Sequence, residues 1–158
     1  RWLTDVLNLD MKMVYCPKTT PQSTNNDSNN FNATLGINHP DQAYQPNSST
    51  CNWYAMKKET YGDFFLRNSP SFFGMVTGRM KAPTKIPVFA DTQKKGDESR
   101  GLFCFEPRVD IGGGLGLVHN ETANLAYADG HVDSMNLREL TADDVSVAFI
   151  GGTKVAIP

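Results

Sequence analysis

The pattern that most constrains the fold is a histidine, nine intervening residues and an Asp-Gly pair, running from His119 to Gly130. Asp and Gly tolerate positive φ, and apolar residues flank the pair on both sides, which is a strong short-range signal for a β-hairpin. We predict a strand at 125–128, a two-residue turn at Asp129 and Gly130, and a returning strand at 132–135. His119 is expected to pack beside this turn or to hydrogen-bond the Asp129 carboxylate.

Other apolar and aromatic runs, bounded by Gly, Pro, Asn or charged residues, predict further strands. Helical spacing of apolar residues predicts an amphipathic helix at 2–9, and short helical turns are expected at 61–66 and 136–140. One helix followed by mostly antiparallel strands favours an α+β roll in a single domain over 1–158. The strands are expected at 11–15, 52–56, 71–80, 86–92, 102–106 and 145–150.

Two segments lack these patterns. The polar segment at about 18–50, rich in Asn and interrupted by Pro, is predicted to be a long surface loop because it cannot bury much apolar area. The glycine run at 112–116 is interpreted as a mobile lead-in to His119. A nucleotide-binding loop would need a Gly-Lys-Ser/Thr step, which does not follow it.

The charge balance excludes one class of partner. Fifteen basic and seventeen acidic residues give a net charge of -2, so the chain carries no field that would strongly attract nucleic acid or anionic lipid. No run approaches the roughly 20 apolar residues that cross a bilayer. We therefore expect no nucleic-acid partner and no membrane span within these residues.

Cysteine content leaves the redox state open. Cys16, Cys51 and Cys104 allow one disulfide in three alternative pairings. We favour Cys16 with Cys51, because this crosslink would close a long polar segment and reduce the entropy of the unfolded chain. Ordinary core positions in a reducing compartment are an equal alternative, and Cys104 lies in an apolar run typical of a core strand.

The hairpin stretch, which ends in Ala128-Asp129-Gly130-His131-Val132, resembles the H-X9-DG domain associated with prepilin-type processing in type II secretion pseudopilin-like proteins. Tyr15-Cys16-Pro17 and the segments 50–54 and 86–91 resemble further parts of such proteins in order and spacing. The likeness reaches from Tyr15 to about Leu140. Its specificity comes from the hairpin, where His119, Asn124, Asp129, Gly130 and His131 are the residues expected to shape the motif.

The resemblance implies a pilin-like fold, with an N-terminal helix packed on a mainly antiparallel sheet, and a structural function without catalysis. The chain would be the head of a type II secretion or type IV pilus-like subunit, anchored in the bacterial inner membrane and exposed in the periplasm or outside the cell. Its partners would be other pseudopilin subunits and the secretion machinery. Such proteins begin with a leader and a long apolar helix that this sequence lacks, so we expect Arg1 to lie inside a longer protein.

Two other functions remain as alternatives. A metal-dependent hydrolase could use His119, Asp129 and His131, joined by Asp133 and Asp91, but strand alternation argues against their forming one compact site. A secreted glycan- or peptide-binding module could use an aromatic groove, although most of these side chains are expected in the core. The aromatic candidates are Trp53, Tyr54, Phe64, Phe65, Phe72 and Phe73.

No cofactor is expected, and calcium is the one alternative. Certain major pseudopilins that resemble this fold bind calcium in a C-terminal loop, which would correspond here to the region of Asp143 and Asp144. Carboxylate oxygens are suitable ligands for calcium, but EF-hand spacing is absent from the sequence.

Overall fold

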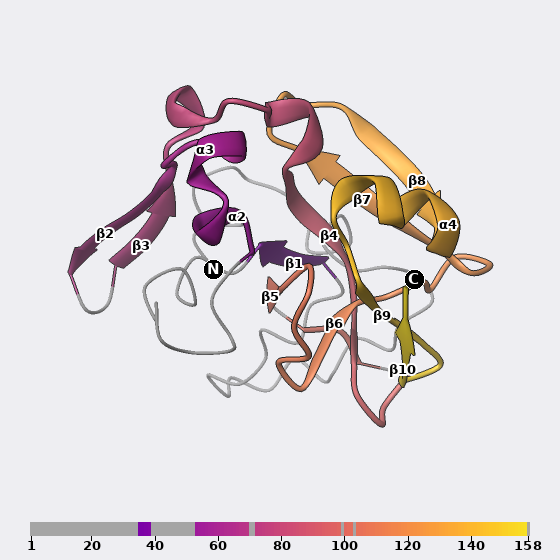
Figure 1. Cartoon of the computed structure of the whole chain (residues 1–158). Helices are drawn as coiled ribbons and strands as arrows, with labels where there is room; N and C mark the ends of the chain where they lie inside the picture. Colours follow the sequence, from indigo (N-terminus) through magenta and orange to yellow (C-terminus); the bar gives the residue numbers. More distant parts are fainter. Residues whose placement is uncertain (1–34, 39–52, 70–71, 99, 103, 158) are drawn as a thin grey trace, which may run out of the picture.

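The computed structural model of the chain describes residues 35–38, 53–69, 72–98, 100–102 and 104–157 (Figure 1). The helix predicted at 2–9, the strand predicted at 11–15 and the proposed Cys16–Cys51 disulfide lie outside these residues. Among the described residues, no helix has the length and apolar character needed to cross a bilayer.

A six-stranded, mainly antiparallel sheet forms the body of the fold, which confirms the α+β class in its coarse form. The hydrogen-bonded order is β5-β1-β4-β7-β8, and β6 pairs with the far end of β4. Among the described strands of this sheet, only β1 and β5 run parallel to each other. The strands are β1 (Leu35–Asn38), β4 (Pro87–Lys94), β5 (Cys104–Phe105), β6 (Gly113–Leu115), β7 (Thr122–Tyr127) and β8 (Val132–Asn136).

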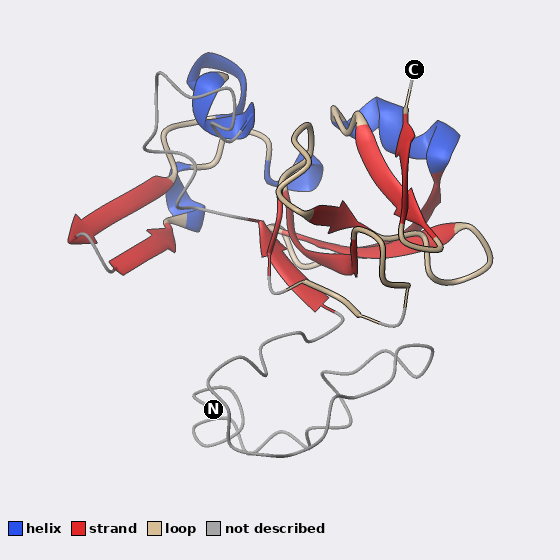
Figure 2. Ribbon diagram, turned by 90° about the horizontal axis from the view of Figure 1, so that it is seen from below, coloured by secondary structure: helices blue, strands red, loops and turns tan. Residues whose placement is uncertain are grey.

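The remaining elements flank this sheet on two sides (Figure 2). One group precedes β4 and consists of α2 (Trp53–Met56), α3 (Lys58–Tyr61), the β2 (Phe65–Ser69) and β3 (Phe72–Met75) hairpin, η3 (Thr77–Arg79) and η4 (Pro83–Lys85). The other follows β8 and consists of α4 (Leu137–Leu140), η5 (Thr141–Asp143) and the β9 (Val147–Ile150) and β10 (Thr153–Ala156) hairpin.

The main core lies between one face of the sheet and the C-terminal elements. Burial alternates along β7, so Ala123, Leu125 and Tyr127 point into the core. They pack with Leu140 of α4 and Ala148 of β9, among others. A second cluster, formed by Tyr54, Tyr61, Phe64, Phe65 and Ile86, holds the elements before β4 together. The opposite face of the sheet stays partly open, because Phe89 on β4 and Val132 on β8 are exposed.

Several sequence predictions are confirmed. The apolar run at 86–92 is the central strand β4, and 145–150 contains β9. The helical turn at 136–140 is α4, which begins with a capping box: the Asn136 side chain accepts from the Glu139 amide, and the Glu139 carboxylate accepts from the Asn136 amide. Cys104 is buried in β5, as expected of a core strand.

Other predictions are wrong in ways that tertiary packing explains. The aromatic run predicted as a strand at 52–56 contains α2, which buries Tyr54 completely. The segment 61–66, predicted as a helical turn, holds the end of α3 and the start of β2. Within the predicted surface loop at 18–50, the described residues form β1, which lies inside the sheet between β4 and β5. The glycine run is not a mobile lead-in, because β6 is a fully buried strand paired with β4.

Candidate functional site

The β7–β8 hairpin is confirmed, with one difference in its turn. Leu125 pairs with Asp133 and Ala126 with Val132. The Gly130 amide donates to the Tyr127 carbonyl at 3.0 Å, and the Tyr127 amide donates to the His131 carbonyl at 2.9 Å. Of the two residues Asp129 and Gly130, only Gly130 takes positive φ, at 97°. The chain therefore reverses through a turn followed by a glycine bulge, and not through a two-residue turn in which both positions are left-handed.

Asp129 fixes the tip of this hairpin, as the sequence predicted, but with a different histidine. Its Oδ1 accepts a hydrogen bond from the His131 amide at 3.2 Å and lies 2.6 Å from His131 Nδ1. Partial desolvation raises the pKa of Asp129, but the bonds from the His131 side chain and backbone outweigh it and lower the pKa below its usual range. The turn is therefore clamped by the histidine that follows it.

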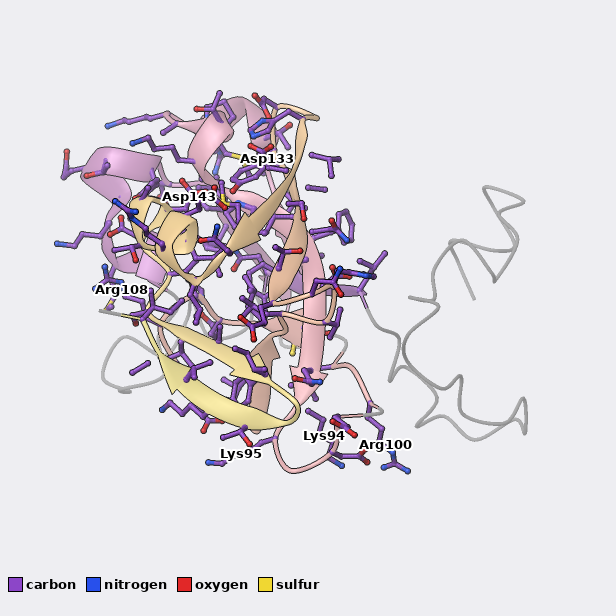
Figure 3. All side chains as sticks on the ribbon, turned by 90° about the vertical axis from the view of Figure 1, so that its right-hand side faces the viewer. Lys94, Lys95, Arg100, Arg108, Asp133 and Asp143 are labelled. Atoms are coloured by element: carbon purple, nitrogen blue, oxygen red, sulfur yellow. The ribbon has the colours of Figure 1, made fainter. Side chains whose placement is uncertain are left out.

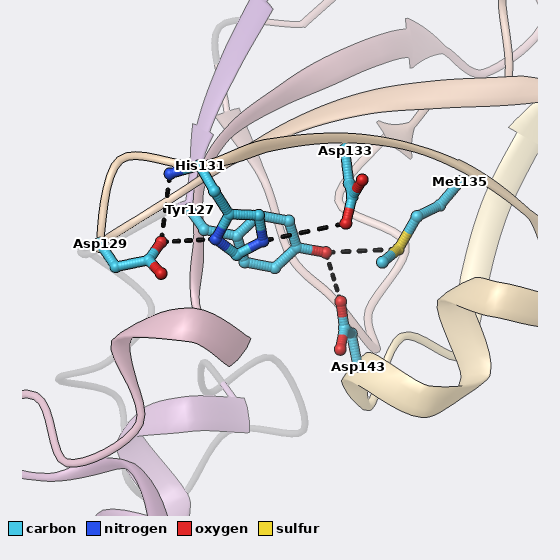
Figure 4. Close-up of polar contacts among 6 residues, drawn as sticks. All are labelled: Tyr127, Asp129, His131, Asp133, Met135 and Asp143. Atoms are coloured by element: carbon cyan, nitrogen blue, oxygen red, sulfur yellow. Dashed lines mark hydrogen bonds and ion pairs between the residues drawn. The ribbon is translucent and has the colours of Figure 1, made fainter.

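His131 links the tip to the core through an aromatic stack (Figure 4). Its ring lies parallel to that of Tyr127, with centroids 4.2 Å apart and planes 6° apart. Its Nε2 lies 3.9 Å from Asp133 Oδ2, so the imidazole stands between two carboxylates. The hairpin is held by ring stacking and hydrogen bonding at its tip as well as by its backbone ladder.

Beneath this stack, three tyrosines converge on two consecutive aspartates, a group that we call the Tyr–Asp cluster. The Tyr127 hydroxyl donates to the Asp143 carboxylate and lies 3.3 Å from Met135 Sδ (Figure 4). Burial, followed by the bond to Asp143, raises the pKa of Tyr127 well above its usual range. The members of the Tyr–Asp cluster are Tyr54, Tyr61, Tyr127, Asp143 and Asp144.

The other two tyrosines join the elements before β4 to the C-terminal region. Tyr54 donates to the Asp143 carbonyl at 3.3 Å, and Tyr61 donates to the Asp144 carboxylate. Asp144 also forms an ion pair of 2.8 Å with Arg108. These hydrogen bonds use the carboxylates that the calcium hypothesis required, and that hypothesis gains no support here.

The predicted position of His119 beside Asp129 is wrong. His119 precedes β7, whereas Asp129 follows it, so six extended residues separate the two ends. His119 instead begins a separate tight turn. Its amide donates to the Thr122 carbonyl at 3.0 Å, and its carbonyl accepts from the Thr122 amide at 3.1 Å. Asn120 and Glu121 in that turn take positive φ, which Asn adopts more readily than most residues.

The structure brings His119 to Asp91 of the central strand. His119 Nε2 lies 3.5 Å from Asp91 Oδ2, and the same oxygen accepts from the Asn124 amide at 2.7 Å. Burial raises the pKa of Asp91 above its usual range, although the Asn124 hydrogen bonds and nearby His119 act in the opposite direction. Two residues of the H-X9-DG motif thus anchor the base of the hairpin to β4, while Asp129, Gly130 and His131 shape its tip.

The raised pKa of Asp91 gives a prediction about stability and pH. Its favourable contribution is complete below the unfolded aspartate value of about 3.9 and is lost as pH rises through the higher folded value. Asp91→Asn removes this titration while keeping an acceptor for the Asn124 amide. We expect the free energy of unfolding of the unchanged protein, relative to Asp91→Asn, to fall as pH rises from about 4 towards neutral, measured by urea unfolding.

Asp110 supplies a control of opposite sign. The hydrogen bond from Lys95 at 2.8 Å lowers the pKa of Asp110, despite an opposing contribution from desolvation. Its contribution to stability is therefore lost as pH falls below about 3.9. Relative to Asp110→Asn, the unchanged protein should gain stability as pH rises towards about 4, and the difference should then stay constant up to neutral pH. If the stability of the unchanged protein relative to Asp91→Asn also rose with pH, the environment assigned to Asp91 would be contradicted.

The structure places His119 away from Asp129 and His131, and it places three of the aromatic candidates in the core. The proposed hydrolase ligands His119, Asp129 and His131 do not converge, and the described part of the chain contains no group of three His, Cys, Asp or Glu residues placed to hold a metal ion. The groove proposed for a glycan or peptide would need exposed aromatic residues. Tyr54, Phe64 and Phe65 are buried in the second core cluster, and the Trp53, Phe72 and Phe73 side chains lie outside the described positions.

The sequence pattern gave no indication of the Tyr–Asp cluster. Tyr54 and Asp143 are 89 positions apart, so no local spacing relates them. The sequence identifies Asp143 and Asp144 only as possible calcium ligands.

A scan against protein-family models, a search of curated proteins and a search of solved structures each found no match to the chain.

Proposed function

We propose that the chain is the globular head of a pseudopilin-like subunit of a type II secretion or type IV pilus-like system. In this proposal the head is structural and needs no cofactor. It is carried by an inner-membrane anchor outside the present sequence and faces the periplasm or the exterior. Its partners are other pseudopilin subunits and the secretion machinery.

The observation that carries the proposal is the way in which the motif residues are used. His119 and Asn124 fix the base of the hairpin on Asp91, and Asp129, Gly130 and His131 fix its tip. Side chains engaged at opposite ends of one hairpin favour a rigid surface for contacts over a shared reaction centre. A mixed α+β fold with a mainly antiparallel sheet is compatible with a pilin-like head.

In the proposed assembly, an apolar helix N-terminal to the head drives packing of neighbouring subunits, because burying apolar surface is favourable. The head then sets the lateral contacts, and the β7–β8 hairpin supplies part of that contact surface. Repetition of one contact between successive subunits would generate a helical filament.

The decisive experiment uses the full-length gene product. Its upstream sequence should encode a leader with a Gly-Phe-type processing step and about 20 apolar residues. Co-expression with the prepilin peptidase of the same organism should shorten the precursor, seen by intact-mass measurement, and a variant in the processing step should stay uncleaved. A full-length gene without such a segment, or a precursor that the peptidase leaves intact, would refute the proposal.

A further inference from the structure

The outer edge of β8 has backbone groups available for another strand. Among the strands that the structure describes, β8 ends the order and pairs only with β7. In an antiparallel ladder, every second residue directs its backbone N–H and C=O groups at the neighbouring strand. The Tyr127 amide bonds the His131 carbonyl, so the backbone groups of Asp133 and Met135 also point at β7. The backbone groups of Val132 and Ser134 therefore point outwards. Val132 and Ser134 have no outward backbone partner among the described residues. An edge of this kind is a template for strand addition.

Neighbouring contacts support this assignment of inward and outward groups. The Asn136 amide, which also faces away from β7, bonds Glu139 Oε2 at 2.9 Å and so closes the C-terminal end of the edge. The Asn124 amide, opposite Ser134, bonds Asp91 on the side of β4. The free part of the edge is therefore short and centred on Val132 and Ser134.

On the open face of the sheet, an apolar row leads to this edge. Phe89 pairs with Ala126, and Ala126 pairs with Val132, so the three side chains share one face. Phe89 is 41% exposed and Val132 is 65% exposed, the largest value among the exposed large hydrophobic residues of the described chain. A strand added beside β8 would extend the row with its own apolar side chain next to Val132.

On the other face, the edge is acidic. The Asp133 side chain is 58% exposed, and with Asp129 it flanks a single imidazole, that of His131. Two carboxylates and one imidazole keep a net negative charge even when His131 is protonated. Lys94, Lys95 and Arg100 lie at the opposite end of the head from Asp133 (Figure 3). Among the described residues, Asp133 forms no ion pair with a Lys or Arg side chain, and a basic residue of a partner would supply one.

We infer that β8 binds an extended segment of a partner protein by strand addition, and that this segment alternates apolar residues with Lys or Arg. Its apolar residues continue the row of Phe89, Ala126 and Val132, and its basic residues face Asp133. A charged side chain on an edge strand disfavours pairing with strands that cannot neutralise it. A segment with a basic residue opposite Asp133 can neutralise this charge, so Asp133 would select for basic partners. The inference rests on the geometry of β8 and does not depend on the proposed function.

A second copy of the chain fits this edge poorly in the registers centred on Asp133 and on Ser134. Antiparallel pairing centred on Asp133 would place two carboxylates directly opposite each other, which is destabilising. Pairing centred on Ser134 would extend to Asn136, whose amide already completes the capping box of α4. The occupant favoured by the charge pattern is therefore a basic segment of another protein.

The test uses the 158-residue chain and a blocked synthetic peptide that alternates Val and Lys. A second peptide replaces Lys by Glu, and a third carries N-methyl groups on the amides that would pair. Addition of the Val-Lys peptide should change the amide chemical shifts of Val132 and Ser134 in NMR spectra. It should also slow the exchange of these amide hydrogens with solvent. The Glu and N-methylated peptides should bind at least about tenfold more weakly.

Two pairs of variants separate backbone pairing from charge. Ser134→Pro removes an outward amide, which edge strands tolerate, whereas Ser134→Ala keeps it; only the first should weaken binding, by about tenfold or more. Asp133→Lys should reverse the preference towards the Glu peptide. Glu59→Lys makes the same charge change in α3 and should leave the preference unchanged.

Three results would overturn the inference. They are equal binding of the N-methylated and unmodified peptides, absence of shifts at Val132 and Ser134 with about 1 mM Val-Lys peptide, and concentration-dependent shifts at these residues without peptide. The last would identify a second copy as the occupant. Because peptidase processing is measured on the full-length precursor, failure of either experiment leaves the other proposal standing.

Discussion

Gly113→Ala is expected to lower the free energy of unfolding by about 3 kcal/mol or more. Gly113 begins β6 at a φ of 148°, which side chains rarely adopt. An added Cβ would lie 2.4 Å from the Gln93 carbonyl oxygen and 2.5 Å from Leu102 Cδ1. Because Gln93 belongs to the paired strand β4, the methyl group would force β6 away from the sheet. Urea unfolding with a shared slope for both proteins measures this loss.

Gly112→Ala is the matched control. Gly112 also has positive φ, at 91°, but no atom lies within 4 Å of its added Cβ. Its cost should therefore be the backbone strain alone, about 1–2 kcal/mol. The difference between the two variants isolates the close approach of β6 to β4. Equal losses would show that β6 is not packed against β4 as described.

This glycine run shows one limit of sequence reasoning. Consecutive glycines are typical of linkers, and nothing local indicates that a neighbouring strand approaches too closely for a side chain. The close contact between β6 and β4 depends on residues about twenty positions apart. Burial of residues 113–116 is therefore a property of the assembled sheet, and the prediction of a mobile lead-in could not include it.

The hairpin was predictable because its signal is local. Asp-Gly between apolar residues specifies the reversal, and the two strands follow directly from it. The partner of His119 was not predictable in the same way. Proximity in sequence favoured Asp129, but β7 is extended and carries the histidine to the far end of the hairpin. Contact with Asp91 required the order of strands in the sheet, which the sequence pattern did not supply.

The helix α2 shows how burial can override the local preference of a segment. Trp53 and Tyr54 favour strands, which led to the prediction at 52–56. In the structure, Tyr54 contacts Tyr61 edge-on, with ring centroids 4.8 Å apart, and reaches the Asp143 carbonyl. Burial of this one aromatic side chain between two parts of the fold is decided by tertiary contacts that no window of sequence contains.

Tyr127→Phe is expected to lower the free energy of unfolding by about 2 kcal/mol, because it removes a hydrogen bond to a buried carboxyl group that would be left without this donor. Asp143 is only 9% exposed, and the Tyr127 hydroxyl is the side-chain donor to its carboxylate among the described contacts. The stack on His131 uses the ring and should persist in the variant. Thermal and urea unfolding measure the loss, and the His131 NMR signals report whether the stack is kept.

Tyr61→Phe provides the comparison that decides between a buried hydrogen bond and a general effect of losing a hydroxyl. Asp144, its acceptor, retains the ion pair with Arg108 and is partly exposed. The loss should therefore stay below about 1 kcal/mol. A double-mutant cycle of Tyr127→Phe with Asp143→Asn should give a coupling of about 1–2 kcal/mol. Equal losses for the two tyrosines would indicate a general effect of losing a hydroxyl, and no coupling would mean that the Tyr127–Asp143 bond does not hold the hairpin to the C-terminal region.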